Sequence, residues 1–408
     1  MPTLLHWSRR LAWESGTNRL ARAREERTAR GLPTIDLTET NPTQVGITYP
    51  EEELAGLLRR SASPVYEPHP RGLPAAREAL AAALSTPEDP VSADDLVLTA
   101  STSEAWSYLF KLFGNPEDEV LTTAPSYPLL DSLAALEGLA LSHVHLAPGR
   151  RFALDPEMVE LLLTPRTCLL ALIHPGNPTG AFLSPGEQAA AVALCASRGL
   201  PLVSDEVFAD YVLEEPSPPG PLSHTHSHPP GRGGTRAGAA AACEEALAFS
   251  LGGLSKSAGL PSWKLGWIRI GGPAALRRQA RAALELIADS YLSVATPVQR
   301  ALPGILELAP GIRSAILGRL RGNLAVLRAA LAGRPEIELL EPAGGWSAVL
   351  RVCDPRPDEE LALELLVEAG VLVHPGYLFD FATDDFLVLS LLPEPGLFAA
   401  GVRRLGRL

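Results

Sequence analysis

The chain has few cysteines and no long apolar stretch. Its 408 residues include four cysteines, and no two of them form a CxxC pair. Cys168 and Cys195 fall in an expected strand and an expected helix, which predicts buried free thiols in a reducing compartment. No run of about 18 apolar residues is present, and the first residues, MPTLLHWSRRLAWESG, lack the apolar core of a signal peptide. We therefore expect no transmembrane helix and a cytoplasmic location.

Positive charge is also scarce. The sequence has 35 Lys and Arg against 47 Asp and Glu, which gives a net charge of −12. Binding to nucleic acid or to an anionic membrane needs a basic surface, so we expect neither as a partner. The length exceeds what one ordinary core accommodates and predicts two domains.

Short apolar runs alternate with helical patterns through the middle of the chain. The expected strands are DLVLTA (95–100), EVLTT (119–123), LSHVHL (141–146), CLLALI (168–173), LPLVSD (200–205), LAFSL (247–251) and LGWIRI (265–270). Helical patterns cover residues 51–61, 72–85 and 102–113. This alternation predicts an α/β fold with a largely parallel sheet. Long helices are expected over 273–333, and strands and helices after 336 predict a second, α+β domain.

One segment has a composition that cannot build a core. Residues 214–245 are rich in Pro, Gly and Ser and carry alternating histidines at His224, His226 and His228. The histidines could bind a metal, but a flexible surface insertion is the favoured interpretation. We therefore predict no metal site.

Two polar loops follow expected strands. In ASTSE (100–104), three small hydroxyl residues at a helix N-terminus could bind a phosphate. An ordinary Ser N-cap with a capping-box Glu is the alternative interpretation of the same residues. HPGNPTG (174–180) lies between a buried strand and a helix, where open α/β sheets place their ligands. Its Asn177 could face a ligand or simply form the turn.

Two charged residues also lie at or shortly after the ends of expected strands. Asp205 ends the run PLVSD, and its alternative role is a helix cap. Lys256 lies in the small-residue stretch LGGLSKSAG after the next strand, and its alternative role is that of a solvated loop lysine. An amine for a Schiff base, a carboxylate for a pyridinium nitrogen, an amide donor and a phosphate loop together suit pyridoxal phosphate (PLP).

The chain resembles the class I/II aminotransferases of fold type I, in the aspartate aminotransferase superfamily. Six motifs in order carry this resemblance: YEPHPRG (66–72), ASTSE, PSYP (125–128), NPTG (177–180), SDEVF (204–208) and the segment 254–267 with LSK, GLP and LGW. The resemblance implies a PLP enzyme with a mostly parallel seven-stranded sheet between helices and a smaller α+β domain. It also implies a homodimer with sites at the subunit interface.

The same resemblance assigns roles to individual residues. Lys256 would form the Schiff base and shuttle a proton, Asp205 would pair with the pyridine nitrogen, and Asn177 would donate to the ring oxygen. The remaining cofactor-binding residues that it implies are Ser101, Thr102, Ser103, Ser255 and Lys264 for the phosphate, Tyr127 for the ring face, and Tyr66 for the phosphate of the neighbouring subunit.

Four positions depart from the family pattern. Phe208 stands where a Tyr usually donates to the ring oxygen, a role that Tyr211 or a water could take over. Lys264 replaces an Arg and lacks its bidentate fork. Gly253 replaces a Ser.

The fourth departure concerns the substrate. Val388 stands where an Arg usually binds the substrate carboxylate. Either another group, such as Arg351 or a residue of the ETNPT loop (39–43), binds the carboxylate, or the substrate is not an ordinary α-amino acid. The expected pocket lies between that loop, Tyr127, GGW (344–346) and HPGYLF (374–379), where Trp346 and Tyr377 favour an apolar or aromatic side chain.

The sequence thus predicts an aminotransferase that moves an amino group between an amino acid and a 2-oxo acid in a ping-pong cycle. A C–S or β-lyase or a decarboxylase on the same fold is the alternative, and a non-catalytic effector-binding module is a third. The expected division is an N-terminal arm with part of the small domain (1–45), a large PLP-binding domain (46–290) and a C-terminal small domain (291–408).

Overall fold

The structure is a computed structural model that describes residues 8, 10, 18–62, 64–213 and 243–407. The alternating histidines of the expected insertion lie outside these residues. Within them, no helix combines the length and apolar character needed to cross a lipid bilayer. All four cysteines are free, Cys195 is buried and Cys168 is only half-buried, so full burial was predicted correctly for Cys195 alone.

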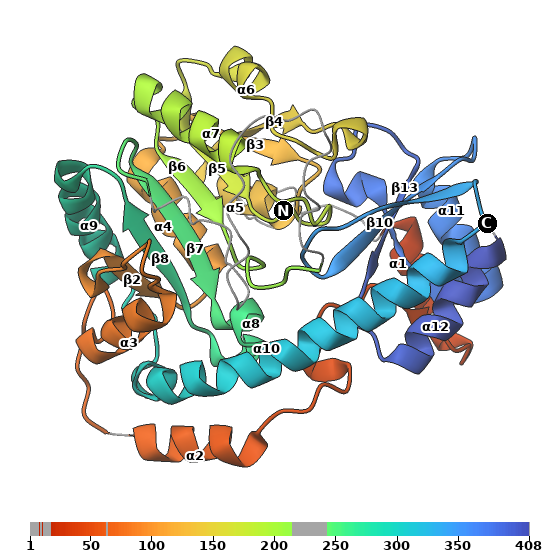
Figure 1. Ribbon diagram of the computed structural model, residues 1–408, viewed down its shortest axis with the longest axis horizontal. Coiled ribbons are helices and arrows are strands. Elements are labelled where there is room, and N and C mark those ends of the chain that lie inside the picture. The colour runs from red at the N-terminus through yellow and green to blue at the C-terminus, as the bar shows by residue number, and fades with distance from the viewer. Residues whose placement is uncertain (1–7, 9, 11–17, 63, 214–242, 408) are drawn as a thin grey trace, which may run out of the picture.

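A seven-stranded sheet forms the centre of the larger part of the molecule (Figure 1). Its strands are β2 (Leu96–Thr99), β3 (Glu119–Ala124), β4 (Ala140–His145), β5 (Thr167–Ile173), β6 (Leu202–Asp205), β7 (Ala248–Gly253) and β8 (Gly266–Gly271). They lie in the order β2-β8-β7-β6-β5-β3-β4, and β8 alone runs antiparallel to its neighbours. The predicted, largely parallel sheet is confirmed.

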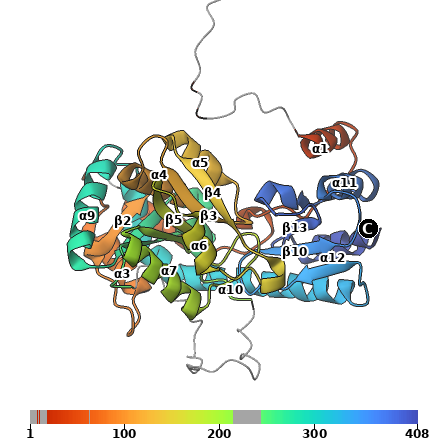
Figure 2. The ribbon, with the colours of Figure 1, turned by 90° about the horizontal axis from the view of Figure 1, so that it is seen from above.

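Helices cover both faces of this sheet (Figure 2). On one face lie α4 (Thr102–Phe113), α5 (Leu129–Glu137) and α9 (Ala274–Asp289), and on the other lie α6 (Pro156–Leu162) and α7 (Pro185–Arg198). Successive strand residues point to opposite faces, so Val120 joins the first core and Leu121 the second. This explains why the central strands appear in the sequence as continuous apolar runs.

A second, four-stranded sheet has the order β12-β13-β10-β9 with antiparallel pairs throughout. Its strands are β9 (Ile337–Leu340), β10 (Ser347–Val352), β12 (His374–Pro375) and β13 (Phe386–Ser390). Beside it, β1 (Ile35–Asp36) pairs in parallel with β11 (Val371–Leu372). The surrounding helices are α1 (Arg19–Ala29), α11 (Asp358–Glu364) and α12 (Pro395–Arg404).

The long helix α10 (Thr296–Leu331) runs from the seven-stranded sheet to the four-stranded sheet (Figure 1). It packs against α2 (Glu51–Ser61), α3 (Pro74–Leu84) and α12. The short helix α8 (Leu254–Ser257) follows β7. Single helical turns complete the described chain: η1 (Pro42–Gln44), η2 (Ala93–Asp95), η3 (Pro148–Arg150), η5 (Pro261–Trp263), η6 (Leu365–Ala369), η7 (Gly376–Phe379) and η8 (Leu405–Arg407).

Candidate active site

Three neighbouring strands end at one edge of the large sheet. In the register of the sheet, Asp205 on β6 pairs with Ile173 on β5 and with Leu251 on β7. Asn177 follows β5, and Lys256 follows β7 on α8. The predicted carboxylate, amide and amine therefore leave adjacent strands at their carboxyl ends, where parallel sheets bind ligands.

The carboxylate of Asp205 receives two hydrogen bonds. The indole Nε1 of Trp106, on α4, donates to it over 3.2 Å, and the backbone amide of Val207 donates over 3.1 Å. Burial raises the pKa of Asp205, while these hydrogen bonds and the charge of Lys256 lower it. The carboxylate of Asp205 is thus held in a fixed orientation. A further positive charge beside it would lower its pKa.

The side chain of Lys256 is half-buried and lies over two aromatic rings. Its Nζ lies 4.4 Å from the ring centroid of Trp346 and 5.3 Å from that of Phe208. Burial lowers the pKa of Lys256 to about 8, although the charge of Asp205 raises it. A lowered pKa makes the neutral, nucleophilic amine accessible near physiological pH, which favours the reactive interpretation over that of a solvated lysine.

The ASTSE loop forms the predicted N-cap of α4, with Glu104 at the capping-box position. Ser101 is the N-cap of α4 and accepts from the amide of Glu104, whose carboxylate accepts from the amide of Ala100. A Cβ on Gly266 would lie 2.9 Å from the carbonyl carbon of Ser101 and 3.1 Å from the amide nitrogen of Thr102. The glycine thus lets β8 approach the first turn of the helix, whose amides and dipole suit a phosphate.

In the turn HPGNPTG, the histidine stabilises the loop by hydrogen bonds and has a structural role. The Nδ1 of His174 accepts from the amide of Leu183, and its Nε2 lies 3.1 Å from the side-chain nitrogen of Gln188. Burial lowers the pKa of His174 to about 4, so the ring stays neutral. Asn177, in the middle of this turn, is half-buried.

The structure bears on one departure from the family pattern, Phe208, and on Tyr211, the substitute donor considered for it. Phe208 is buried and packs edge-on against Trp346. Tyr211 is also buried, and its hydroxyl donates over 2.6 Å to the backbone oxygen of Lys256. That hydroxyl is therefore committed to the backbone of the lysine, which disfavours Tyr211 as the replacement donor considered from the sequence.

The position of the expected carboxylate-binding Arg is apolar. Val388 on β13 pairs with Val349 and His374, and it is buried in a cluster with Phe152, Phe379, Phe381 and Phe386. Arg351 is exposed and binds the carboxylate of Asp385 over 2.7 Å. Arg351 is thus already paired with a carboxylate, which disfavours it as the replacement for the missing Arg.

The remaining predicted residues differ in exposure. Tyr66 is 67% exposed and Tyr127 is 46% exposed, so each of these side chains is open to a ligand or a second subunit. Thr102, Ser103 and Ser255 are half-buried, whereas Lys264 is exposed and has a left-handed backbone with φ 48°. No hydrogen bond within the described chain ties the side chain of Lys264 to the ASTSE loop.

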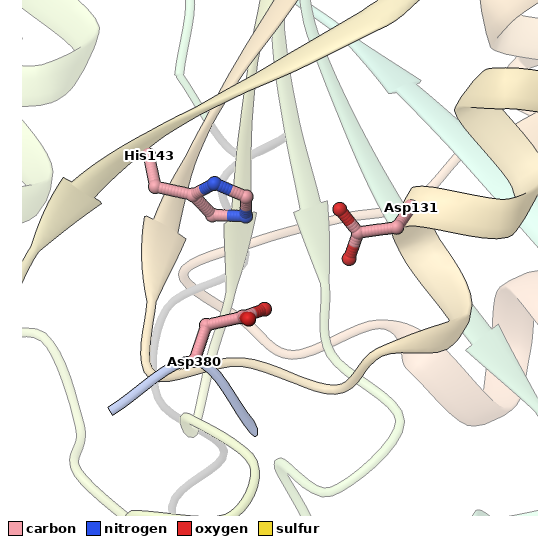
Figure 3. A group of neighbouring side chains, drawn as sticks. All are labelled: Asp131, His143 and Asp380. Atoms are coloured by element: carbon pink, nitrogen blue, oxygen red, sulfur yellow. The ribbon is translucent and has the colours of Figure 1, made fainter. Parts of the chain in front are cut away.

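A second group of charged side chains lies at the far edge of the same sheet. Asp131 on α5, His143 on the edge strand β4 and Asp380 after η7 point toward one another (Figure 3). Each offers one possible metal-ligand atom, and these atoms all lie within 4.8 Å of one another. Their sequence separation left no motif from which this group, here called the edge cluster, could be predicted.

Trp106 is the main site residue that sequence reasoning missed. It lies 99 positions before Asp205 in the chain, on the second turn of the helix that the ASTSE loop begins. The available signal was its place five residues after the N-cap Ser101, on the side of α4 that packs on the sheet with the other apolar residues of the helix. An aromatic at that spacing is more often part of the core, and Trp106 is indeed buried there as well.

Comparison with known proteins agrees with the geometry. The chain is 26% identical to the tyrosine aminotransferase of Bos taurus over 330 residues, 79% of this chain and 70% of that protein. It is 28% identical to the alanine aminotransferase of Mycobacterium tuberculosis (strain ATCC 25618 / H37Rv) over 319 residues, 77% of this chain and 70% of that protein.

Solved structures share the fold. The alanine aminotransferase from Pyrococcus furiosus superimposes with a TM-score of 0.85 at 21% identity, covering 98% of this chain and 99% of that one. The model of the family described as aminotransferase class I and II matches residues 65–392. This match spans the strand ends with Asn177, Asp205 and Lys256, as well as the four-stranded sheet. The chain therefore belongs to the aminotransferase class I and II family.

Proposed function

We propose that this aminotransferase moves an amino group between an amino acid and a 2-oxo acid, with PLP bonded to Lys256. The observation that carries the proposal is that Lys256 and Asp205 leave adjacent strand ends and that the charge of each shifts the pKa of the other. Lys256 has a pKa lowered to about 8, and Asp205 is oriented by Trp106 and Val207. Titratable groups with strongly shifted pKa values cluster at functional sites.

The residues present suit the cofactor. The first turn of α4 offers backbone amides to a phosphate, and Gly266 leaves the space beside them free of a Cβ. Asp205 offers a carboxylate for a protonated pyridine nitrogen, and Asn177 offers an amide for the ring oxygen. Ser101, Thr102, Ser103, Ser255 and Lys264 complete the proposed phosphate contacts, and Tyr127 the contact with the ring face.

The chemistry divides between the cofactor and the chain. When bound, PLP supplies a carbonyl carbon that bonds an amine and a ring that accepts electron density from the substrate. Asp205 keeps the proton on the ring nitrogen, because a carboxylate beside a cation favours the charged form. The amine of Lys256 would move the proton from the substrate α-carbon to C4′ of the cofactor, as a base with a pKa near the working pH should.

The assembly and location belong to the same proposal. We propose a homodimer in which the exposed Tyr66 reaches the phosphate site of the partner subunit, and a cytoplasmic location. We also propose the division into residues 1–45, 46–290 and 291–408, with the substrate pocket between the two larger parts.

An absorbance spectrum of the purified protein with PLP tests the proposal. We expect a visible band that is absent in Lys256→Ala, and a shift to the near-ultraviolet pyridoxamine form with one class of amino acid. A protein without the band, or a band unchanged in Lys256→Ala, would refute the assignment of Lys256. Release of pyruvate and ammonia without any 2-oxo acid acceptor would instead indicate a lyase.

A further inference from the structure

The turn that carries Lys256 depends on other segments for its position. The helix α8 has only four residues, and no side chain caps its N-terminus. A helix this short is unstable by itself, because few internal hydrogen bonds offset the cost of ordering its backbone. The hydroxyl of Tyr211 donates to the backbone oxygen of Lys256 over 2.6 Å. The hydroxyl of Tyr49 donates to the backbone oxygen of Gly259, at the end of the same turn, over 2.8 Å.

Of these two tyrosines, Tyr211 also contacts the surroundings of the amine. Its ring packs edge-on against the ring of Trp346, with the centroids 5.1 Å apart. The ring centroid of Trp346 in turn lies 4.4 Å from Nζ of Lys256. Tyr211 therefore fixes the backbone from which the lysine side chain starts, and through Trp346 it also supports the surface on which the amine lies.

Tyr211 itself is held firmly. Its side chain is fully buried, and burial raises its pKa, so the hydroxyl stays protonated and acts as the donor. Its backbone amide donates to Phe208 over 2.9 Å, and its backbone oxygen accepts from the amide of Gly345 over 3.0 Å. The next residue, Val212, forms an antiparallel bridge with Gly344. Tyr211 thus joins the segment after β6, the lysine turn and the segment before β10.

We propose that Tyr211 is a positioning residue that holds the amine of Lys256 where proton transfer from the substrate α-carbon requires it, an inference that rests on the proposed function. A displacement of a reacting group by about 1 Å can lower a rate roughly 10²-fold, so a contact that fixes the lysine acts on the reaction without touching the substrate. Asp205 lies six residues earlier on the same segment. One segment would then set the place of both the carboxylate and the amine.

Tyr211→Phe tests this inference, because it removes the hydroxyl and keeps the ring. Tyr49→Phe is the matched control, since it removes the same kind of hydrogen bond from the same turn, three residues beyond Lys256. We expect both variants to fold, to form the visible band with PLP and to lose a similar, small amount of thermal stability. With the amino acid that shifts the wild-type spectrum most, kcat should fall about tenfold in Tyr211→Phe and KM should change by about twofold or less. Tyr49→Phe should keep kcat within about twofold of the wild-type value.

A deuterium isotope effect identifies the step that Tyr211 influences. The probe is the same amino acid with deuterium on its α-carbon, and the measurement is the ratio of kcat for the two forms. Because a misplaced amine slows the proton transfer itself, we expect the ratio in Tyr211→Phe to be at least as large as in the wild-type protein. A role in stability alone would leave kcat and this ratio unchanged.

Three outcomes would overturn the inference. An unchanged kcat in Tyr211→Phe would show that the hydrogen bond does not affect the reaction. Equal losses of kcat in Tyr211→Phe and Tyr49→Phe would show a general loosening of the turn. A smaller isotope effect in Tyr211→Phe would show that another step is slowed. In each case the wild-type protein still transfers the amino group, so the proposed function stands. If no amino acid shifts the wild-type spectrum, the proposed function itself fails and this inference fails with it.

Discussion

Two charged regions of the seven-stranded sheet differ in their position on the sheet and in their ratio of acidic to basic groups. The candidate active site lies at the ends of the central strands β5, β6 and β7, and it joins an amine to a carboxylate. The edge cluster lies on and beside the edge strand β4, and it joins two carboxylates to one histidine (Figure 3). At the centre a positive and a negative group influence each other, whereas charge at the edge is gathered where solvent can screen it.

The pKa shifts follow this difference. Burial lowers the pKa of Lys256 to about 8 and raises that of Asp205, and each charge opposes the shift of the other. At the edge, burial also raises the pKa of Asp131, with His143 opposing and Asp380 reinforcing the shift. Removing a charge should therefore have a large functional effect at the centre and a small one at the edge.

The largest difference should come from Asp205→Asn. We expect the rate of amino-group transfer to fall roughly 10²-fold, because a neutral amide no longer favours a proton on the ring nitrogen. Steady-state kinetics measures this change. The same substitution at the edge, Asp131→Asn, should leave the rate within about twofold, and equal losses in the two variants would contradict the comparison.

Gly266→Ala should have the next largest effect. Its Cβ would lie 2.9 Å from the backbone of Ser101, so the first turn of α4 must shift at a cost of about 1–3 kcal/mol. We expect weaker PLP binding, measured by equilibrium dialysis, and a lower melting temperature. Gly311→Ala, in α10 with open space around it, is the control and should be neutral or slightly stabilising. Unchanged PLP affinity in Gly266→Ala would argue against a phosphate at this turn.

The pH dependence of PLP incorporation sharpens the comparison further. Because the folded pKa of Lys256 is lowered to about 8, the neutral amine is scarce below that pH and dominant above it. We expect the rate of cofactor bonding by the apoprotein to rise with a midpoint near pH 8, measured by stopped-flow absorbance. Since Asp205 raises the pKa of Lys256, the midpoint should move to lower pH in Asp205→Asn. A midpoint near 10 in the wild-type protein would show that the lysine is solvated.

The smallest effect should follow Asp380→Asn. Asp380 has φ 60°, which Asn adopts about as readily as Asp, so the backbone is not newly strained. Loss of the repulsion between Asp131 and Asp380 should stabilise the protein by about 1 kcal/mol or less at pH 8, measured by thermal unfolding. A clear destabilisation at that pH would show that the two carboxylates share a favourable partner.

Local patterns were sufficient for the elements of the site. The expected helix at 102–113 coincides with α4, and the apolar runs before Asn177 and Lys256 are β5 and β7. Asp205 is the last residue of β6, as its place after an apolar run predicts. These predictions depend on hydrophobic periodicity and on turn residues, which act between near neighbours in the chain.

Contacts between distant segments could not be predicted in the same way. The bond from Trp106 to Asp205 and the ring of Trp346 over Lys256 each join residues at least 90 positions apart. A buried tryptophan looks the same in the sequence whether its N–H has an acceptor or lacks one. The alternative role of Tyr211 could be judged only once its hydroxyl was seen to bind the backbone of Lys256.

The sequence by itself determined the parallel sheet, the strand-end positions of Asn177, Asp205 and Lys256, and the absence of an Arg at position 388, because these follow from residue identity and local period. Tertiary structure decided the lowered pKa of Lys256, the orientation of Asp205, the unpartnered N–H of Trp346 and the edge cluster. Burial and hydrogen-bond geometry depend on which distant segments the fold brings together, and no local pattern encodes that.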